Sequence, residues 1–206
     1  MRYQELKQQL QMFAVFSLAD IRKVDPLFHR RQLSTWAAKD YIKKLRRGYY
    51  MFNDTVLNED VLFLIANRIY IPSYVSFESA LSYYGLIPEG VYSVTSATSK
   101  KTSRFKTPIA DFTYRKIKPE LLFGYNLQKR GNQSYKIADV EKAVLDYLYL
   151  NPTIVRDADF YEWRFNREDF LAKADLQKMR KYAEAFRSKA LLIRFNRLLS
   201  LIHESR

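Results

Sequence analysis

The order of short amphipathic segments in the first fifty residues constrains the fold of this 206-residue chain more than any other feature. Residues 3–13 carry apolar side chains at helical spacing, and Ser17 then stands where a helix over Leu18–Val24 would take its N-cap. Pro26 ends that helix, because proline lacks an amide donor and pushes the residue before it out of the helical conformation. The pattern predicts two helices followed by a sharp turn.

A third amphipathic stretch follows, in which Leu33, Trp36 and Ala37 share one face, so Trp36 is predicted to lie in the core. The other faces are polar or basic, which is typical of a recognition helix. Amide and hydroxyl groups suit the edges of bases, whereas most Lys and Arg side chains hold phosphate. The candidates for DNA contact on this helix are Arg30, Arg31, Gln32, Ser34, Thr35 and Lys39, with Gln32, Ser34 and Thr35 favoured for base edges.

Two β-prone runs, residues 41–45 and 49–52, are joined by a turn in which Gly48 can take a positive φ. Their tip is basic and too short to bury its charges, so we expect it to meet phosphate. Helix, helix, turn, helix and basic hairpin are the parts of a winged helix-turn-helix, predicted here over residues 1–55. Its wing adds four candidates for DNA contact, which are Lys43, Lys44, Arg46 and Arg47.

Charge supports the same partner. Residues 1–52 hold eleven Lys and Arg against four Asp and Glu, and the whole chain has a formal net charge of +13. Such a surplus favours a polyanion through counterion release, and double-stranded DNA is the polyanion that a winged helix-turn-helix binds. An ordinary solvated surface is the alternative reading of the charge alone.

Residues 56–206 are predicted to form a mixed α+β domain with a helical C-terminus. Residues 60–69 read as a short helix or strand, and Ser76 and Gly85 are placed to cap the two ends of a further helix. Runs of β-branched and aromatic residues predict a small sheet of at least three strands, over residues 91–98, 104–107 and 111–117. Helices are predicted over residues 139–150 and, as one continuous helix of about seven or eight turns, from residue 176 onward.

The sheet region carries a second basic patch, which either is a solvated face or binds nucleic acid or an acidic protein surface. The patch comprises Lys100, Lys101, Arg104, Arg115 and Lys118. The C-terminal helix also has a basic face that we expect to remain free for a partner, comprising Lys178, Arg180, Lys181, Arg187, Lys189, Arg194 and Arg197.

Catalytic and metal chemistry have few candidate residues. The chain has no Cys and only two His, His29 and His203, and it contains no phosphate-binding loop, dinucleotide-binding glycine pattern or HExxH motif. The paired carboxylates Asp139/Glu141 and Glu168/Asp169 stand at predicted helix starts and read as caps. We therefore expect no catalytic residue, no metal and no cofactor.

No run approaches the roughly 18 to 20 apolar residues of a membrane helix, and the start MRYQELKQQL lacks the apolar region of a signal peptide. A soluble, cytoplasmic protein without a membrane partner is the expectation.

Several segments together resemble the AbiEi family of antitoxins from type IV toxin-antitoxin systems. The resemblance covers roughly residues 10–150 and is carried by LRRGYYMF, IPSYVSFESALSYYGLIPE, VYSVTSATSKKTSRFKTPIADFTYRKIKPELLFGY and YKIADVEKAVLDYLYL. The serine-rich helix segment followed by the threonine- and lysine-rich strand segment is its most specific part. The winged helix alone would fit many families of regulators.

The resemblance implies an autorepressor that binds repeats in its own operon promoter and counteracts a nucleotidyltransferase-like toxin, in systems linked to abortive phage infection. By the same resemblance the DNA contacts map onto residues 30–39 and the wing at residues 43–47. Whether the antitoxin touches the toxin stays open.

Two other functions remain open from the sequence. The chain could be a stand-alone transcriptional regulator whose residues 56–206 dimerise or sense a ligand. It could also be an enzyme acting on nucleic acid or on a toxin, with Ser, Thr, Asp and Glu side chains as its available groups.

Overall fold

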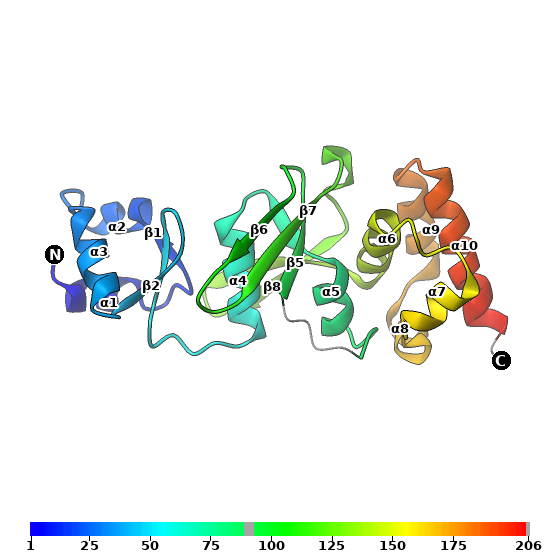
Figure 1. The fold of residues 1–206 in the computed structure, drawn as a ribbon, viewed down its shortest axis with the longest axis horizontal. Coiled ribbons are helices and arrows are strands. Elements are labelled where there is room, and N and C mark those ends of the chain that lie inside the picture. Colours follow the sequence, from blue (N-terminus) through cyan, green and yellow to red (C-terminus); the bar gives the residue numbers. More distant parts are fainter. Residues whose placement is uncertain (89–92, 205–206) are drawn as a thin grey trace.

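The computed structural model describes residues 1–88 and 93–204, so Glu89 of the resembling segment and residues 91–92 of a predicted strand lie outside the described residues. The fold is α+β. Figure 1 shows a small N-terminal unit, a central sheet with flanking helices and a group of C-terminal helices in a row along the long axis of the molecule.

The N-terminal unit has the order and pairing of a winged helix-turn-helix. Its helices are α1 (Tyr3–Leu10), α2 (Leu18–Val24) and α3 (Arg31–Ala38), and its strands are β1 (Phe16–Ser17), β2 (Ile42–Arg46) and β3 (Tyr49–Phe52). The antiparallel sheet has the order β1-β3-β2, so the hairpin β2–β3 follows α3 directly. The predicted helices and wing are confirmed, whereas the two-residue strand β1 was not predicted.

Helix α2 starts and ends where the sequence indicates. Ser17 accepts a hydrogen bond from the amide of Asp20, whose carboxylate in turn accepts one from the amide of Ser17, which together form a capping box. At the other end Asp25 has left the helical conformation, with φ −133° and ψ 92°, in front of Pro26.

A six-stranded mixed sheet with the order β6-β7-β5-β4-β9-β8 forms the centre of the molecule. The pairs β4/β9 and β5/β7 are parallel and the others are antiparallel. The strands are β4 (Ser73–Val75), β5 (Ser93–Thr98), β6 (Ser103–Lys106), β7 (Asp111–Lys116), β8 (Tyr125–Arg130) and β9 (Gln133–Ala138). The prediction of at least three strands holds for β5, β6 and β7, but β4, β8 and β9 were missed.

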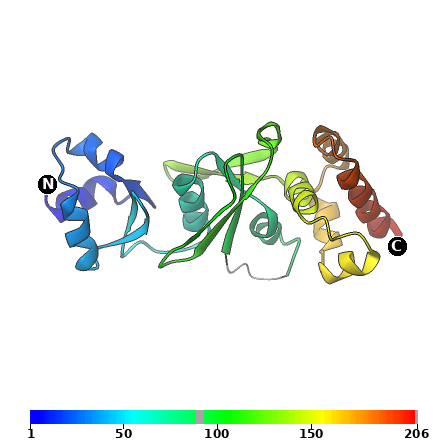
Figure 2. The same cartoon turned by 45° about the horizontal axis from the view of Figure 1, so that its top comes forward.

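Helices cover both faces of this sheet. The hydroxyls of Tyr114 and Tyr135 donate to Ala66 and Asp60, which places α4 (Glu59–Ile69) on one face. On the other face Tyr74 donates to Asp146 of α6 (Val140–Leu150), and α5 (Phe77–Tyr83) packs on β5. Figure 2 shows α4 and α5 on opposite sides of the strands.

Ser76 does not cap α5 as predicted. It stands at the N-cap position, but its side chain makes no capping hydrogen bond. Instead its hydroxyl donates to the buried carboxylate of Asp146 on the neighbouring helix at 2.8 Å. A tertiary partner has replaced the local one, because a buried carboxylate needs donors. Gly85 does lie just beyond the helix, with φ +71°.

The predicted long C-terminal helix is wrong. The chain forms α9 (Leu176–Ala185) and α10 (Lys189–Glu204), after the shorter helices α7 (Asp157–Glu162) and α8 (Arg167–Lys173). Arg187 takes a left-handed conformation with φ +50° between α9 and α10, which reverses the chain direction. The expected apolar seam therefore does not continue, and Ile193 is 67% exposed.

The buried apolar residues form two clusters. One lies inside the N-terminal unit and includes Leu33, Trp36, Tyr50 and Phe52. The other runs through the rest of the molecule and also takes in Met51. Because side chains alternate along a strand, β3 sends Tyr50 and Phe52 into its own unit and Met51 toward the neighbouring one. Strand β3 is thus buried on both faces.

Candidate nucleic-acid interface

Helix α3 presents one face to solvent and buries the opposite one. Leu33 and Trp36 are 1% and 8% exposed, and the ring of Trp36 contacts the rings of Tyr3 and Phe28. The prediction that Trp36 is a core residue is confirmed. The outward side carries the exposed residues Arg31, Ser34, Thr35 and Ala38, with Arg30 and Lys39 exposed at the two ends.

Gln32 does not belong to this outward face. Its side chain is half-buried, and its Oε1 is enclosed without a hydrogen-bond partner among the residues that the structure describes. The expectation that Gln32 reads a base edge is therefore not supported, because helix periodicity turns it toward the flank of α3. Ser34 and Thr35 are exposed, and the Thr35 hydroxyl makes a long contact, 3.5 Å, to the carbonyl of Arg31.

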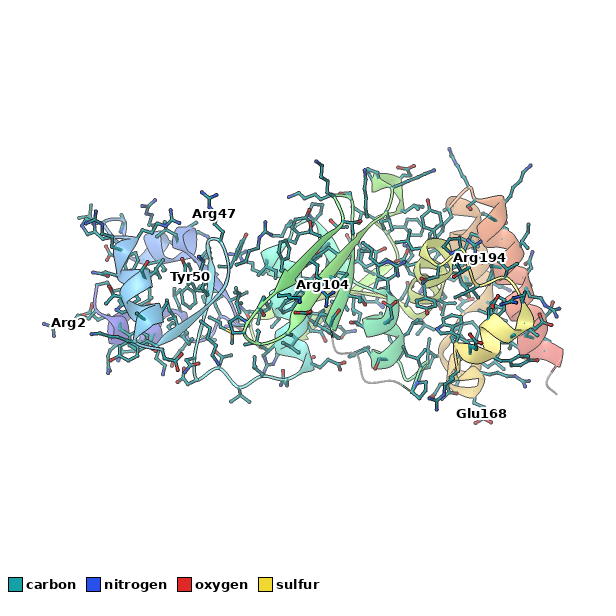
Figure 3. All side chains as sticks on the ribbon, viewed as in Figure 1. Arg2, Arg47, Tyr50, Arg104, Glu168 and Arg194 are labelled. Carbon is teal, nitrogen blue, oxygen red and sulfur yellow. The ribbon has the colours of Figure 1, made fainter. Side chains whose placement is uncertain are left out.

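The wing is a tight hairpin. Gly48 takes φ +87°, a conformation that favours glycine, and a register shift between Lys44 and Arg46 adds a bulge beside the turn. Lys44 and Arg47 are exposed and Lys43 is half-buried. In Figure 3 the side chain of Arg47 projects away from the hairpin into solvent.

Arg46 does not join the other cations of the wing. Its guanidinium donates to the carbonyl of Ile69 at the end of α4, and it lies 4.3 Å from the ring centre of Phe105 and 5.3 Å from that of Tyr70. The expectation that Arg46 meets phosphate is thus wrong for this arrangement. The central unit supplies a carbonyl and two aromatic faces that the sequence of the hairpin cannot reveal.

The second basic patch divides into free and engaged members. Arg104 pairs with Asp111 at 2.6 Å. Arg115 donates to the carbonyl of Leu150 at 2.7 Å and lies 4.7 Å from the ring centre of Phe77. Both arginines have partners within the fold, so the patch as predicted does not form one free surface. Lys100, Lys101 and Lys118 are exposed.

Two exposed lysines of this patch, Lys100 and Lys101, lie close to the wing. The Lys100 ammonium is 5.6 Å from the ring centre of Tyr70, the ring that Arg46 also approaches, and the Tyr70 hydroxyl donates to the carbonyl of Lys101 at 2.8 Å. The turn between β5 and β6 lies on the upper edge of the sheet in Figure 1, and Arg47 points to the same side in Figure 3.

These outward cations have no carboxylate partner. Within residues 1–88 and 93–204, no ion pair involves Arg31, Lys44, Arg47, Lys100 or Lys101. Exposed Lys and Arg side chains without carboxylate partners attract phosphate and are available to hold it. The arrangement suits a nucleic-acid backbone.

Three of the seven residues on the predicted basic face of the C-terminal helices are engaged within the fold. Arg194 is 8% exposed and donates to the carbonyl of Leu148, Arg197 pairs with Asp157, and Lys178 pairs with Asp139 and Glu141. Only the exposed members remain available to a partner, and they are Arg180, Lys181, Arg187 and Lys189.

A buried ionic cluster lies under α6 and was not anticipated from the sequence. Lys142 pairs with Asp146 one helical turn later, both side chains are fully buried, and Tyr74 and Ser76 donate to the same carboxylate at 2.7 and 2.8 Å. Burial lowers the pKa of Lys142, and Asp146 opposes that effect. The Lys-to-Asp spacing of four residues was the available signal.

This cluster anchors α6 to the sheet. Lys142 is enclosed by the rings of Tyr74, Phe123 and Phe186, with ring centres 4.8 to 5.3 Å from its ammonium. Asp139 caps α6 as predicted, through the amide of Lys142, and burial raises the pKa of Asp139 while Lys178 opposes the rise. An enclosed ammonium surrounded by rings has no room for a substrate.

The remaining candidates for chemistry are scattered. Within the described part of the chain, no three His, Asp or Glu side chains are grouped so as to hold a metal ion. His29 is exposed in front of α3 and His203 is exposed in α10. Glu168 and Asp169 occupy the first turn of α8, whose N-cap is Asn166.

Across the described ranges no helix has the length and apolar character needed to cross a bilayer. No model of a known protein family matches the chain, and a search of characterised proteins finds no match to its sequence. A functional proposal therefore rests on the residues described above.

Proposed function

We propose that the N-terminal unit binds double-stranded DNA and that the chain is a transcriptional repressor of its own promoter. The observation that carries the proposal is the outward face of α3, with Arg31, Ser34 and Thr35 exposed beside a wing whose Arg47 has no carboxylate partner within the described residues. A helix of this size fits the major groove, where hydroxyl groups reach base edges and Arg reaches guanine or phosphate.

The wing then contacts the backbone next to the groove that α3 occupies. Lys44 and Arg47 supply the charges, while Arg46 holds the wing against the central unit. Lys100 and Lys101 lie near Tyr70, the ring that Arg46 of the wing also approaches, so a duplex that extends past the wing meets their ammonium groups. Each phosphate contact adds roughly 0.9 to the slope of log affinity against log salt.

Salt-dependent binding tests this proposal. Fluorescence anisotropy of a mixed-sequence duplex of about 30 base pairs should give a steep salt slope for the wild type. Lys44→Gln with Arg47→Gln should lower that slope by about 2. Lys181→Gln with Lys189→Gln is the matched control, because both lysines are exposed and lie in α9 and α10, at the opposite end of the molecule from the wing. If the control variant weakens DNA binding as much as the wing variant does, the proposed interface is rejected.

Base reading is tested separately. Ser34→Ala with Thr35→Ala should relax discrimination between the chain's own promoter and unrelated DNA, by about 1 to 3 kcal/mol for each base pair that is read. Binding to unrelated DNA should stay the same, because neither hydroxyl carries charge.

For residues 56–206 we propose an antitoxin role that counteracts a nucleotidyltransferase-like toxin. The support is the resemblance of residues 10–150 to the AbiEi family. Expression of the neighbouring gene should be toxic, and the full chain should rescue growth. The Lys44→Gln with Arg47→Gln variant should still rescue while derepressing the promoter.

A stand-alone regulator that senses a ligand is the second candidate. A specific observation favours it, which is a large cleft between the N-terminal and central units. If expression of the neighbouring gene is not toxic and the chain still binds its promoter, the stand-alone regulator is the better assignment.

A further inference from the structure

A large cleft lies between the two units. It has a volume of about 640 Å³ and is lined on one side by residues of α1, α2 and the segment between α1 and β1, and on the other by residues of α4, β4, β8 and β9. Small-molecule sites have volumes of this size and favour the boundary between domains. No residue proposed above to touch DNA lines it.

The walls of the cleft are apolar although they face solvent. Phe13 is 44% exposed, Ile71 is 53% exposed and Leu127 is 62% exposed, and all three line the cleft together with Val24. Large apolar side chains that converge on one concavity mark a binding site more often than isolated ones do.

A buried hydroxyl group also belongs to the lining of the cleft. Ser73 is 7% exposed and lines the cleft, and its hydroxyl finds no hydrogen-bond partner among the described residues. An unsatisfied buried hydroxyl is energetically unfavourable, so a ligand group that bonds to it would be favoured.

Charge around the cleft is unbalanced. The carboxylate of Asp20 is held by Arg68 at 2.8 Å and approached by Lys23 at 3.9 Å. Lys136, which is opposite Leu127 in the β8/β9 register, lies over the ring of Tyr125 and has no carboxylate partner in the described ranges. Three cations thus line the cleft with one carboxylate, which favours an anionic ligand.

We propose that this cleft binds a compact, largely apolar small molecule that carries one anionic group. The apolar body lies between Phe13, Ile71 and Leu127. The anionic group lies near Lys136, and the hydroxyl of Ser73 donates to a polar atom of the ligand.

Binding of a ligand in the cleft also changes the affinity for DNA, and this inference rests on the proposed function. A ligand that touches both units stabilises the docked arrangement in which Arg47 and the turn bearing Lys100 face the same side. It therefore raises affinity for duplex DNA, and by thermodynamic linkage DNA raises affinity for the ligand by the same factor. The molecule acts as a corepressor.

Two dyes of almost identical shape test the site in the full chain without DNA. They are 1-anilinonaphthalene-8-sulfonate, which is anionic, and N-phenyl-1-naphthylamine, which is neutral. Both should bind saturably at one site with enhanced fluorescence, the sulfonate more tightly. Leu127→Asn with Ile71→Asn should weaken both by tenfold or more. Val155→Asn with Ile193→Asn is the matched control, because these side chains are 58% and 67% exposed and lie among the C-terminal helices.

Lys136→Gln should remove most of the preference for the sulfonate and leave the neutral dye unchanged. Absence of saturable binding, or binding that Leu127→Asn with Ile71→Asn leaves intact, would overturn the site. A dimer seen by light scattering that the same variant dissociates would also overturn it, because the occupant would then be a second copy of the chain.

Adding a mixed-sequence duplex of about 30 base pairs should tighten dye binding about fivefold. If the dyes bind in the cleft but the duplex itself does not bind, the DNA function fails and the site stands. If the duplex binds and dye affinity stays constant, the corepressor role fails.

Discussion

The guanidinium of Arg46 on the wing lies 4.3 Å from the ring centre of Phe105 on the edge strand of the central sheet. Its neighbour Arg47, one residue further along the hairpin, is exposed and has no such partner among the described residues. Adjacent arginines of one turn therefore have different roles, one in holding two units together and one available to phosphate.

This difference predicts opposite phenotypes. Arg46→Gln should lower the free energy of unfolding by about 1 to 3 kcal/mol, because it loses a charged hydrogen bond and a cation–π contact. Arg47→Gln should leave unfolding within about 0.5 kcal/mol of wild type and weaken DNA binding. Urea denaturation and anisotropy on the same samples would measure both. Equal effects of the two substitutions on stability would contradict the assignment.

The buried pair under α6 should behave as a unit. Lys142→Met alone leaves the carboxylate of Asp146 in the core without its cation and should cost about 3 to 5 kcal/mol. Lys142→Met with Asp146→Leu should cost clearly less than the sum of the two single changes, because no uncompensated charge remains. A double-mutant cycle from denaturant melts would show the coupling, and additive losses would argue against it.

Gly124 is expected to resist substitution. It takes φ +69°, and an added Cβ would lie 2.9 Å from the Tyr182 ring and 3.0 Å from the Cβ of Lys142. Gly124→Ala should therefore cost about 2 to 4 kcal/mol, from the left-handed backbone and from crowding. Gly131→Ala is the control, since it has φ +56° but open space around it, and should cost only about 1 kcal/mol. Similar melting temperatures for the two variants would refute the crowding.

Asp20 should make the contact between the units sensitive to acid. Burial opposes the effect, but hydrogen bonds from Ser17 and the pairing with Arg68 hold the pKa of Asp20 below its usual range. A depressed carboxyl pKa contributes stability above the unfolded pKa of about 3.9, and that stability is lost as the pH falls through the folded pKa. The gap in melting temperature between wild type and Asp20→Asn should be wide at pH 6 and close toward pH 3. A gap that is constant with pH would count against the pairing.

Local signals in the sequence were sufficient for the helices and the hairpin of the N-terminal unit. Ser17, Pro26 and Gly48 each act through their own backbone, as a cap, a helix end and a turn, so α2 and the wing appear where they were predicted. The α+β class followed from the same kind of pattern. Whether Ser34 and Thr35 read bases stays a prediction, although the structure places both on the outward face of α3.

Long-range partners explain what the sequence did not reveal. Nothing in the hairpin indicates that Ile69 and Phe105 would engage Arg46. Helix periodicity places Gln32 on the flank of α3, but it does not show that its Oε1 is enclosed without a partner among the described residues. The break between α9 and α10 falls at Arg187, with neither glycine nor proline to mark it. Strand β8 reads YNLQKR, which lacks clear alternation because it is an edge strand.

Met51 has a consequence for anyone who divides this protein. It belongs to the first fifty-five residues along the chain, yet it is 1% exposed within the apolar cluster of the neighbouring unit, where Val15 and Leu45 are also buried. Cutting near residue 55 would expose apolar side chains on both fragments, because residues on both sides of the cut form this cluster. A shortened version that aggregates would therefore say little about its activity, and single substitutions in the intact chain are the sounder way to separate its roles.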